Sequence, residues 1–198
     1  MKFTRIPETA FQELQLNAGV MLSAFNPAAP EGVEELVANL LGATSGGVNF
    51  TATPSYTDFG EDIDNAPVNV KELKKLDNWE VKMSGTFVTV STNLAKRLIG
   101  AADIDASDTT KIVPRNDVKV DDFKDIWWVG DYSDKNGDTN GGFVAIHMMN
   151  GLSTGGFSIQ SGNKAKGQFA FEFTGHYSID AQDTVPFEVY VKSGSEEA

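Results

Sequence analysis

The stretch Lys166-Gly-Gln-Phe-Ala-Phe-Glu-Phe-Thr-Gly-His-Tyr177 points most clearly to the fold of this chain. Its side chains alternate between two sets, with Phe169, Phe171, Phe173 and Tyr177 on one face and Gln168, Glu172, Thr174 and His176 on the other. Successive side chains of a strand point to opposite faces of the sheet. The pattern therefore predicts a half-buried antiparallel strand with an aromatic inner face.

A second alternating run lies between Phe187 and Lys192. Its two faces are Phe187, Val189 and Val191 on one side and Glu188, Tyr190 and Lys192 on the other. Pro186 stands at its start, where a missing N–H is tolerated. We expect the last third of the chain, from Gly151 to Val191, to form paired and packed strands rather than a catalytic site.

Composition limits the classes of protein that the chain can belong to. With 198 residues it is most simply one domain. It has no cysteine, which excludes disulfides and thiolate metal sites and favours a reducing compartment. No apolar run approaches the ~20 residues of a spanning helix, and the N-terminus lacks the apolar core of a signal peptide. We expect a soluble intracellular product, or one exported without a Sec-type signal.

The chain is strongly acidic, with 28 acids against 16 bases and a net charge of −12. Tight binding to nucleic acid relies on clustered lysines and arginines, so an acidic chain is not a phosphate-binding protein by default. The charge has two interpretations, which the sequence leaves open. It provides solubility, or it makes a surface that repels nucleic acid.

Several further strands and helices are expected. Leu36, Val37, Leu40 and Leu41 follow Val33 at helical spacing, with glutamates in the first turn, which predicts a short amphipathic helix. A second helix begins at Ser91 or Thr92 and extends to about Ala102. The expected strands are Ala18–Phe25, Ile126–Val129, Gly142–Met149 and Ser158–Gln160, with a turn at Asn150-Gly151 before the last of them. Together these elements predict a mainly β fold, an antiparallel β-sandwich or barrel with one flanking α-helix and a long hairpin arm.

The most regular alternation in the chain follows Gly46-Gly47. One face of this strand carries Phe50, Ala52, Pro54 and Tyr56, and the other carries Asn49, Thr51, Thr53, Ser55 and Thr57. Pro54 cannot donate to a neighbouring strand, so it predicts an edge position. A face made only of asparagine, threonine and serine predicts a surface that stays in contact with water.

A long polar insert, Phe59 to Leu76, separates this strand from the next, which is expected to begin at Trp79. Loops beyond about 12–15 residues are uncommon inside a compact domain and are usually functional or disordered. The hairpin formed by the two strands should therefore project a long arm. Val81, Met83, Gly85 and Phe87 alternate with polar residues and predict the buried face of the second strand.

No pattern of residues indicates an enzyme or a metal site. Asp134-Lys-Asn-Gly-Asp138 resembles the start of a calcium loop, but Thr139 and Ala145 replace the required glycine and glutamate, so a hairpin turn is favoured. His147 and His176 have no acidic or cysteine partner at ligand spacing. Nucleophile–base pairs have no obvious members.

Other clusters also have ordinary explanations. Glu61, Asp62 and Asp64 could mimic a carboxylate pair, but polar loops usually contain such residues. The pairs Gly141-Gly142 and Gly155-Gly156 lack the Gly-Lys-Ser/Thr of a phosphate loop and fit strand bends or close backbone approach. Trp127-Trp128 places one ring on each face of its strand, and one ring is exposed unless a neighbour covers it.

Four stretches of the chain carry a resemblance to a known family. They are Gly42-Ala-Thr-Ser-Gly-Gly-Val-Asn-Phe50, Trp79-Glu-Val-Lys-Met-Ser-Gly-Thr-Phe-Val88, Lys111-Ile-Val-Pro-Arg-Asn116 and Lys166–Tyr177. In order and spacing the chain resembles the major tail proteins of long-tailed bacteriophages, above all those of phages and prophages of Gram-positive bacteria. The resemblance runs from about Phe11 to Val191, and no catalytic signature is part of it.

The resemblance implies a structural virion protein, a tail tube subunit with a β-sandwich fold. Such subunits assemble into hexameric rings that stack into a hollow tube, the conduit for DNA ejection. It implies one tail tube domain over 1–198, with an N-terminal arm at 1–17, the extended loop at 59–76 and a flexible acidic tail at 193–198. Its partners would be further copies of itself, the tail terminator, tape measure and baseplate or initiator proteins, and genomic DNA that passes without tight binding. Such a subunit would need no cofactor and no membrane. It would be located in the virion tail after assembly in the host cytoplasm.

The family also implies where subunits meet. Its long hairpin arm contacts neighbouring rings, which assigns inter-ring contacts to Phe59, Glu61, Asp62, Ile63, Lys71, Leu73 and Lys74. The polar face of Asn49, Thr51, Thr53 and Ser55 is the first candidate for the wall of the lumen. Related tubes occur in contractile tails and phage-derived bacteriocins, so the type of particle stays open.

Two other functions remain as alternatives. One is a monomeric β-sandwich that binds carbohydrate, with Trp127 or Trp128 as an exposed stacking platform. The other is a head or decoration protein of a phage, which would assemble with a capsid. An enzyme has the least support, since it needs a pocket built from residues with no recognisable spacing.

Overall fold

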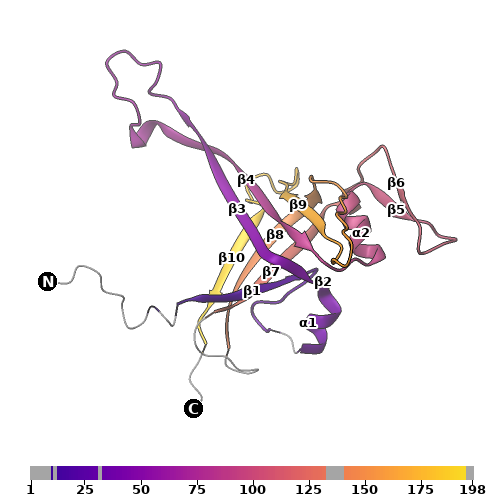
Figure 1. Cartoon of the computed structure of the whole chain (residues 1–198). Coiled ribbons are helices and arrows are strands. Elements are labelled where there is room, and N and C mark those ends of the chain that lie inside the picture. Colours follow the sequence, from indigo (N-terminus) through magenta and orange to yellow (C-terminus); the bar gives the residue numbers. More distant parts are fainter. Residues whose placement is uncertain (1–9, 11–12, 31–32, 133–140, 195–198) are drawn as a thin grey trace.

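The computed structural model describes residues 10, 13–30, 33–132 and 141–194. The chain is mainly β, an antiparallel sheet with two α-helices (Figure 1). The strands are β1 Gln15–Leu22, β2 Leu40–Gly42, β3 Thr44–Asp58, β4 Lys74–Phe87, β5 Ala102–Ile104, β6 Ile112–Pro114, β7 Lys124–Tyr132, β8 Gly142–Ser153, β9 Phe169–Gly175 and β10 Phe187–Lys192. The helices are α1 Val33–Asn39 and α2 Thr92–Ile99, with short 3-10 turns η2 Lys71–Leu73 and η3 Val120–Asp122.

The main sheet has the strand order β2-β1-β7-β8-β9-β4-β3, and β10 also pairs with β8. Strand β8 joins the two parts of the sheet, because it pairs with β7 on one side and with β10 and then β9 on the other. The change of partner follows Asn150, whose φ is +50°. The predicted turn at Asn150-Gly151 is therefore wrong: the strand bends there and continues to Ser153. Of the strand expected at Ser158–Gln160, only Gln160 forms a bridge, to Gln168.

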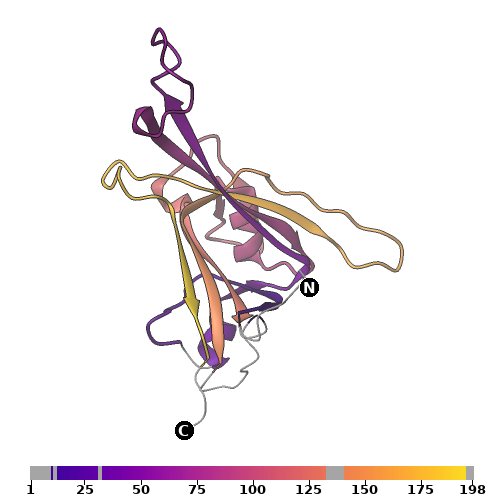
Figure 2. The ribbon, with the colours of Figure 1, turned by 90° about the vertical axis from the view of Figure 1, so that its left-hand side faces the viewer.

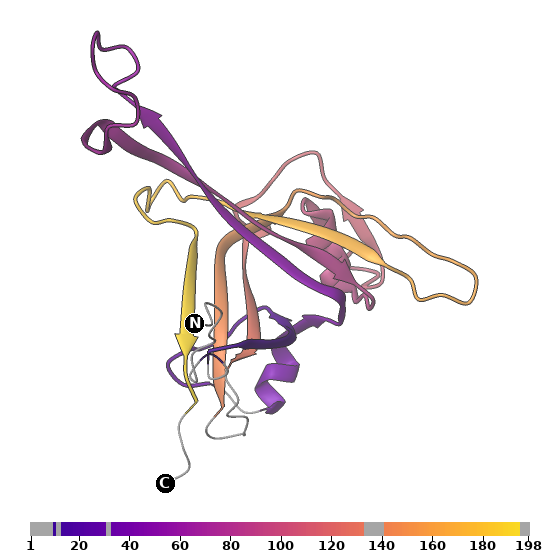
Figure 3. The same ribbon diagram turned by 60° about the vertical axis from the view of Figure 1, so that its left-hand side comes forward.

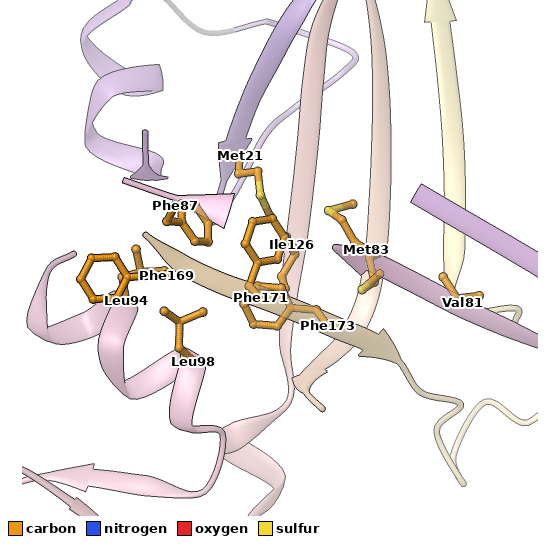
Figure 4. Close-up of a cluster of buried hydrophobic side chains, with 11 residues drawn as sticks. Met21, Val81, Met83, Phe87, Leu94, Leu98, Ile126, Phe169, Phe171 and Phe173 are labelled. Carbon is orange, nitrogen blue, oxygen red and sulfur yellow. The ribbon is translucent and has the colours of Figure 1, made fainter. Parts of the chain in front are cut away.

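The main hydrophobic core lies between the two parts of the sheet and is covered by α2 (Figure 4). The aromatic face predicted for β9 is confirmed, since Phe169, Phe171 and Phe173 are buried. The ring centroids of Phe87 and Phe171 are 4.5 Å apart. Tyr177 lies beyond the strand, and its hydroxyl accepts a hydrogen bond from the N–H of Trp79 at 3.0 Å. The buried members are Met21, Val81, Met83, Phe87, Leu94, Leu98, Ile126, Met148, Phe169, Phe171 and Phe173.

Both helices expected along the sequence are present in the described ranges, one more than the single flanking helix of the predicted fold, and both end earlier than expected. Helix α1 stops at Asn39, so that Leu40 and Leu41 join β2. The cap predicted for α2 is confirmed, because the Ser91 hydroxyl accepts from the N–H of Leu94 at 3.1 Å. Helix α2 ends at Ile99, three residues before the expected Ala102, and Gly100 follows as its C-cap with φ +85°.

A second, smaller cluster lies around Trp127. It contains Leu22, Trp127, Phe143 and Ala145, with Phe25, Leu36, Val129 and Tyr190 packed against it. Strand β10 contributes Tyr190 to this cluster, while Val189 and Val191 are exposed. The valine face of β10 is thus not the buried one along most of the strand.

Some predictions concern residues outside the described ranges. These are the turn and calcium-like segment within 133–140, most of the N-terminal segment 1–17, and the end of the acidic tail, 195–198. The first strand begins at Gln15 and ends at Leu22, earlier at both ends than the expected Ala18–Phe25. Within the described ranges, no helix has the length and apolar character needed to cross a membrane.

Candidate assembly surfaces

The arm is a two-stranded ribbon, formed by the outer halves of β3 and β4. The two strands pair from Thr44 and Phe87 at one end to Asp58 and Lys74 at the other. Strand β4 therefore begins at Lys74, and the prediction that the insert extends to Leu76 is wrong. The loop that closes the ribbon spans residues 59–73 and includes η2. Figures 1, 2 and 3 show the ribbon projecting well beyond the rest of the molecule.

The ribbon leaves the core at a β-bulge. Ser55 faces Asn78 and Tyr56 faces Leu76, so Asp77 has no counterpart on β3. Tyr56 and Leu76 are 54% and 42% exposed, although both are large apolar residues in paired strands. Beyond the bulge the ribbon keeps apolar side chains but loses the core that would cover them.

The end of the arm is also apolar and exposed. Phe59, Ile63 and Val68 all lie in the closing loop with most of their side chains uncovered. Exposed apolar groups gathered on one projection are typical of interaction sites. The arm is thus a candidate surface for assembly.

Polar contacts hold the closing loop in one shape. The Asp58 carboxylate accepts from the N–H of Gly60 and of Asn69, both at 2.9 Å. These backbone donors lower the pKa of Asp58. The Lys74 ammonium donates to the side chain of Asn69 at 2.8 Å. The apolar residues of the loop are therefore presented on an ordered frame.

The structure places the predicted contact residues on this arm in different settings. Phe59, Glu61, Asp62 and Ile63 are exposed in the loop. Lys71 is exposed and lies 3.3 Å from Glu72. Lys74 is exposed at the start of β4, with its ammonium 5.7 Å from the centre of the Tyr56 ring.

Leu73 is the least exposed of the predicted contact residues. It is half-buried, and its carbonyl accepts from the N–H of Phe59 at 3.0 Å. A Cβ placed on Gly60 would lie 3.3 Å from a methyl carbon of Leu73. Leu73 therefore packs within the arm, where it closes the loop on the ribbon.

The polar face predicted for β3 is confirmed as exposed. Asn49, Thr51, Thr53 and Ser55 all lie on the solvent side. Strand β3 ends the strand order, so the edge position predicted from Pro54 is also confirmed.

Neighbouring strands extend this polar face. Asn49 of β3 lies opposite Ser84 of β4, which lies opposite Glu172 of β9. In the same way, Thr51 lies opposite Lys82, which lies opposite Thr174. Glu80 lies opposite Thr53. The result is a broad surface of hydroxyl and amide groups that also carries Lys82, Glu80 and Glu172.

The lysine opposite Thr51 on this face, Lys82, is compensated locally. The Lys82 ammonium lies 2.6 Å from the Glu80 carboxylate, and this contact raises the pKa of Lys82. The Ser55 hydroxyl is satisfied by Asn78 at 2.8 Å, and the hydroxyls of Thr154 and Thr174 are 2.8 Å apart. Such a face offers little to hold a phosphate, because binding of nucleic acid requires clustered basic groups.

Besides β2 and β3, the ends of the strand order, β10 forms a further free edge that the sequence did not predict. In the described part of the chain it pairs only with β8. Its exposed Val189 and Val191 lie beside unpaired backbone groups. Free edges with apolar residues are templates for pairing with another chain.

His147 has no acidic partner at ligand spacing in the sequence, but the fold brings two carboxylates to it. Its Nε2 lies 3.0 Å from the Asp125 carboxylate and its Nδ1 lies 3.7 Å from that of Glu188. Its ring stacks on Trp127, with centroids 4.0 Å apart. These residues come from β7, β8 and β10, so the fold gathers partners that sequence spacing separates. Among the residues described, no group of three or more histidine, cysteine, aspartate and glutamate side chains could hold a metal ion.

Neither adjacent tryptophan presents a free platform. Trp127 is buried in the second cluster. Trp128 packs against the main core, and its Nε1 donates to the carbonyl of Ala18 at 3.0 Å. A bulge in β1 makes room for this ring, since a Cβ on Gly19 (φ +68°) would lie 2.6 Å from it. The expectation of one ring on each face is met; neighbours bury Trp127 and partly bury Trp128.

The paired glycines behave as predicted. A Cβ on Gly142 would lie 2.6 Å from the carbonyl oxygen of Tyr132, which is close backbone approach, and Gly156 has φ +69°. They serve the path of the backbone.

No protein-family model matches this chain, and no curated protein matches it either.

Proposed function

We propose that this chain is a structural subunit of a bacteriophage tail tube, a major tail protein. Copies of it would associate as hexameric rings, and the rings would stack into a hollow tube through which DNA passes. In this proposal the two parts of the sheet pack as a β-sandwich of the tail tube type. The protein would work in the virion tail after assembly in the host cytoplasm, with tail terminator, tape measure and baseplate or initiator proteins at its ends.

One observation carries this proposal: the β3–β4 ribbon continues past its core with apolar residues uncovered. Tyr56 and Leu76 face no part of the described chain that buries them, and Phe59, Ile63 and Val68 extend the apolar surface. An ordered arm of this kind is costly to expose to water unless a partner covers it. A second copy of the chain is the partner that the resemblance implies.

Free sheet edges support the ring. Among the described residues, β3 and β10 each pair on one side only, which leaves backbone groups unpaired on two different strands. Joining unlike edges of successive copies gives a heterologous contact, which closes into a ring if the rotation permits. Closure removes the edges and with them the risk of uncontrolled aggregation.

The polar face of β3, β4 and β9 supports the conduit. Its hydroxyl and amide side chains and its locally paired Lys82 offer no cluster of positive charge. DNA could pass such a wall without the counterion release that accompanies tight binding.

Sedimentation velocity over a concentration series tests the proposal. We expect the 21.4 kDa chain to form large species as its concentration rises. Phe59→Ser combined with Val68→Ser should shift the boundary back to the monomer. Ile179→Ser, on a different exposed loop, is the matched control and should assemble as the unaltered chain does. A monomer at every concentration for the unaltered chain would contradict the proposal.

A further inference from the structure

We propose that the connection between β8 and β9, residues 154–168, is the surface that receives the arm tip of a second copy. The proposal rests on the proposed function, and it names the partner of the arm within the assembly. It commits to another copy of this chain as the occupant.

The β8–β9 connection has a defined shape. Gln160 and Gln168 exchange two backbone hydrogen bonds, at 2.8 and 2.9 Å. The N–H of Ala165 closes a turn onto the carbonyl of Gly162 at 3.2 Å. At its base, a Cβ on Gly155 would lie 3.0 Å from the backbone nitrogen of Glu172. The connection is thus built against the sheet and presents a formed hairpin.

This hairpin presents apolar side chains to solvent. Phe157 and Ile159 are both exposed. Phe157 also contacts the core at one side, since its ring centroid lies 6.0 Å from that of Phe169. The arm tip has the same character, with Phe59, Ile63 and Val68 exposed. Burial of both surfaces against each other would remove apolar area from water.

The charges of the two surfaces are opposite. Residues 154–168 contain Lys164 and Lys166 and no acid, in a chain with 28 acids. Residues 59–70 contain Glu61, Asp62 and Asp64 and no base. None of the ion pairs within the described ranges involves these five side chains. Complementary charge of this kind sets orientation and partner choice at an interface.

The two surfaces leave the body on different sides. Figures 2 and 3 show the arm and the β8–β9 hairpin pointing away from each other, so they cannot meet within one copy. When two unlike surfaces on different sides of a subunit bind each other, every copy keeps one surface free for the next copy, so the contact can repeat along an open assembly. The geometry therefore fits stacking along a tube.

Cysteine cross-linking tests the contact, because the chain has no cysteine of its own. Ile63→Cys is placed in one tagged copy and Ile159→Cys in another, and the mixture is oxidised. The control replaces the second variant by Ile179→Cys, whose side chain is more exposed than that of Ile159, 83% against 58%. We expect the first pair to cross-link about tenfold more, because docking raises the effective concentration of the thiols. Equal yields from the two pairs would overturn the proposal.

A charge exchange gives an independent readout. Lys164→Glu with Lys166→Glu should reduce the fraction that sediments as large species, and adding Glu61→Lys with Asp62→Lys should restore it. Loss without restoration, or no loss, contradicts the docking. If the unaltered chain forms large species but the specific cross-link is absent, this contact is overturned and the proposed function stands. If the unaltered chain is monomeric and the cross-link is absent, both proposals are contradicted. Binding of the unaltered chain to duplex DNA that is lost in the Lys164→Glu, Lys166→Glu variant would show that these lysines serve nucleic acid and would overturn the docking.

Discussion

Asp58 and Lys74 face each other as the outermost pair of the β3–β4 ladder, and both side chains reach into the loop beyond it. Asp58 accepts from two backbone N–H groups of the loop, and Lys74 donates to Asn69. The pair thus ends the ribbon and orders the closing loop. The loop can be removed at this point without entering the core.

Replacing residues 59–73 by Asn-Gly should give a folded protein that does not assemble. The new turn connects Asp58 directly to Lys74, and Asn-Gly suits a tight antiparallel hairpin. Its circular dichroism and its unfolding midpoint in urea should match those of the unaltered chain, while large species disappear from sedimentation. Assembly at the unaltered level would show that the arm tip has no role in it.

Phe173→Ala should destabilise the monomer by about 3–5 kcal/mol, because it leaves a cavity in the main core. Phe173 is 1% exposed and lies between β4 and β8 on the inner face of β9. Val189→Ala, on the exposed edge of β10, is the comparison and should change stability by less than about 0.5 kcal/mol. Equilibrium unfolding in urea measures both, and a small effect at Phe173 would place the core elsewhere.

Stability should fall in acid through Asp122. Burial raises the pKa of this carboxyl, but the N–H of Lys119 and the Arg115 guanidinium outweigh it and hold the pKa below the usual 3.8. Two guanidinium contacts, at 2.6 and 2.8 Å, carry the interaction. Asp122 has a lower pKa in the folded protein than in the unfolded chain, so the unfolded chain binds the proton at a higher pH. The stabilisation is therefore complete above about pH 4 and is lost as the pH falls through the pKa of the folded state.

Asp122→Asn should therefore lower stability at neutral pH and flatten the loss below about pH 4. The readout is the urea midpoint as a function of pH for both proteins. A parallel decline of the two curves in that window would rule out this carboxylate as a cause.

The assembled tube should not bind duplex DNA in a salt-dependent way. On the polar face of β3, β4 and β9, Lys82 is paired with Glu80, and the chain carries a net charge of −12. Counterion release requires clustered bases, so fluorescence anisotropy at low ionic strength should show no binding. Micromolar or tighter binding that weakens with salt would contradict the role assigned to this face.

Side-chain periodicity was sufficient to predict the buried and exposed faces of β3, β4 and β9. Alternation is a local property, so an apolar residue such as Phe171 indicates the buried face of its strand and a polar residue such as Thr51 indicates the exposed face. The Ser91 cap and the edge position of Pro54 also came from local chemistry. The arm itself was predicted from the length of its insert.

Features that depend on long-range pairing were missed. The sequence indicated a turn at Asn150-Gly151, but β8 exchanges partners there and continues. Lys74 to Asn78 look like a polar loop, yet pairing with β3 makes them strand. His147 finds Asp125 and Glu188 only because three strands bring them together. The exposed valines of β10 likewise result from its place at an edge, which no local pattern shows.

Negative-stain electron microscopy of the purified protein over a concentration series is the sharpest test of a self-assembling tube subunit. We predict rings and hollow tubes of uniform diameter at high concentration, and their absence when residues 59–73 are replaced. Single particles of monomer size at every concentration would contradict the assignment.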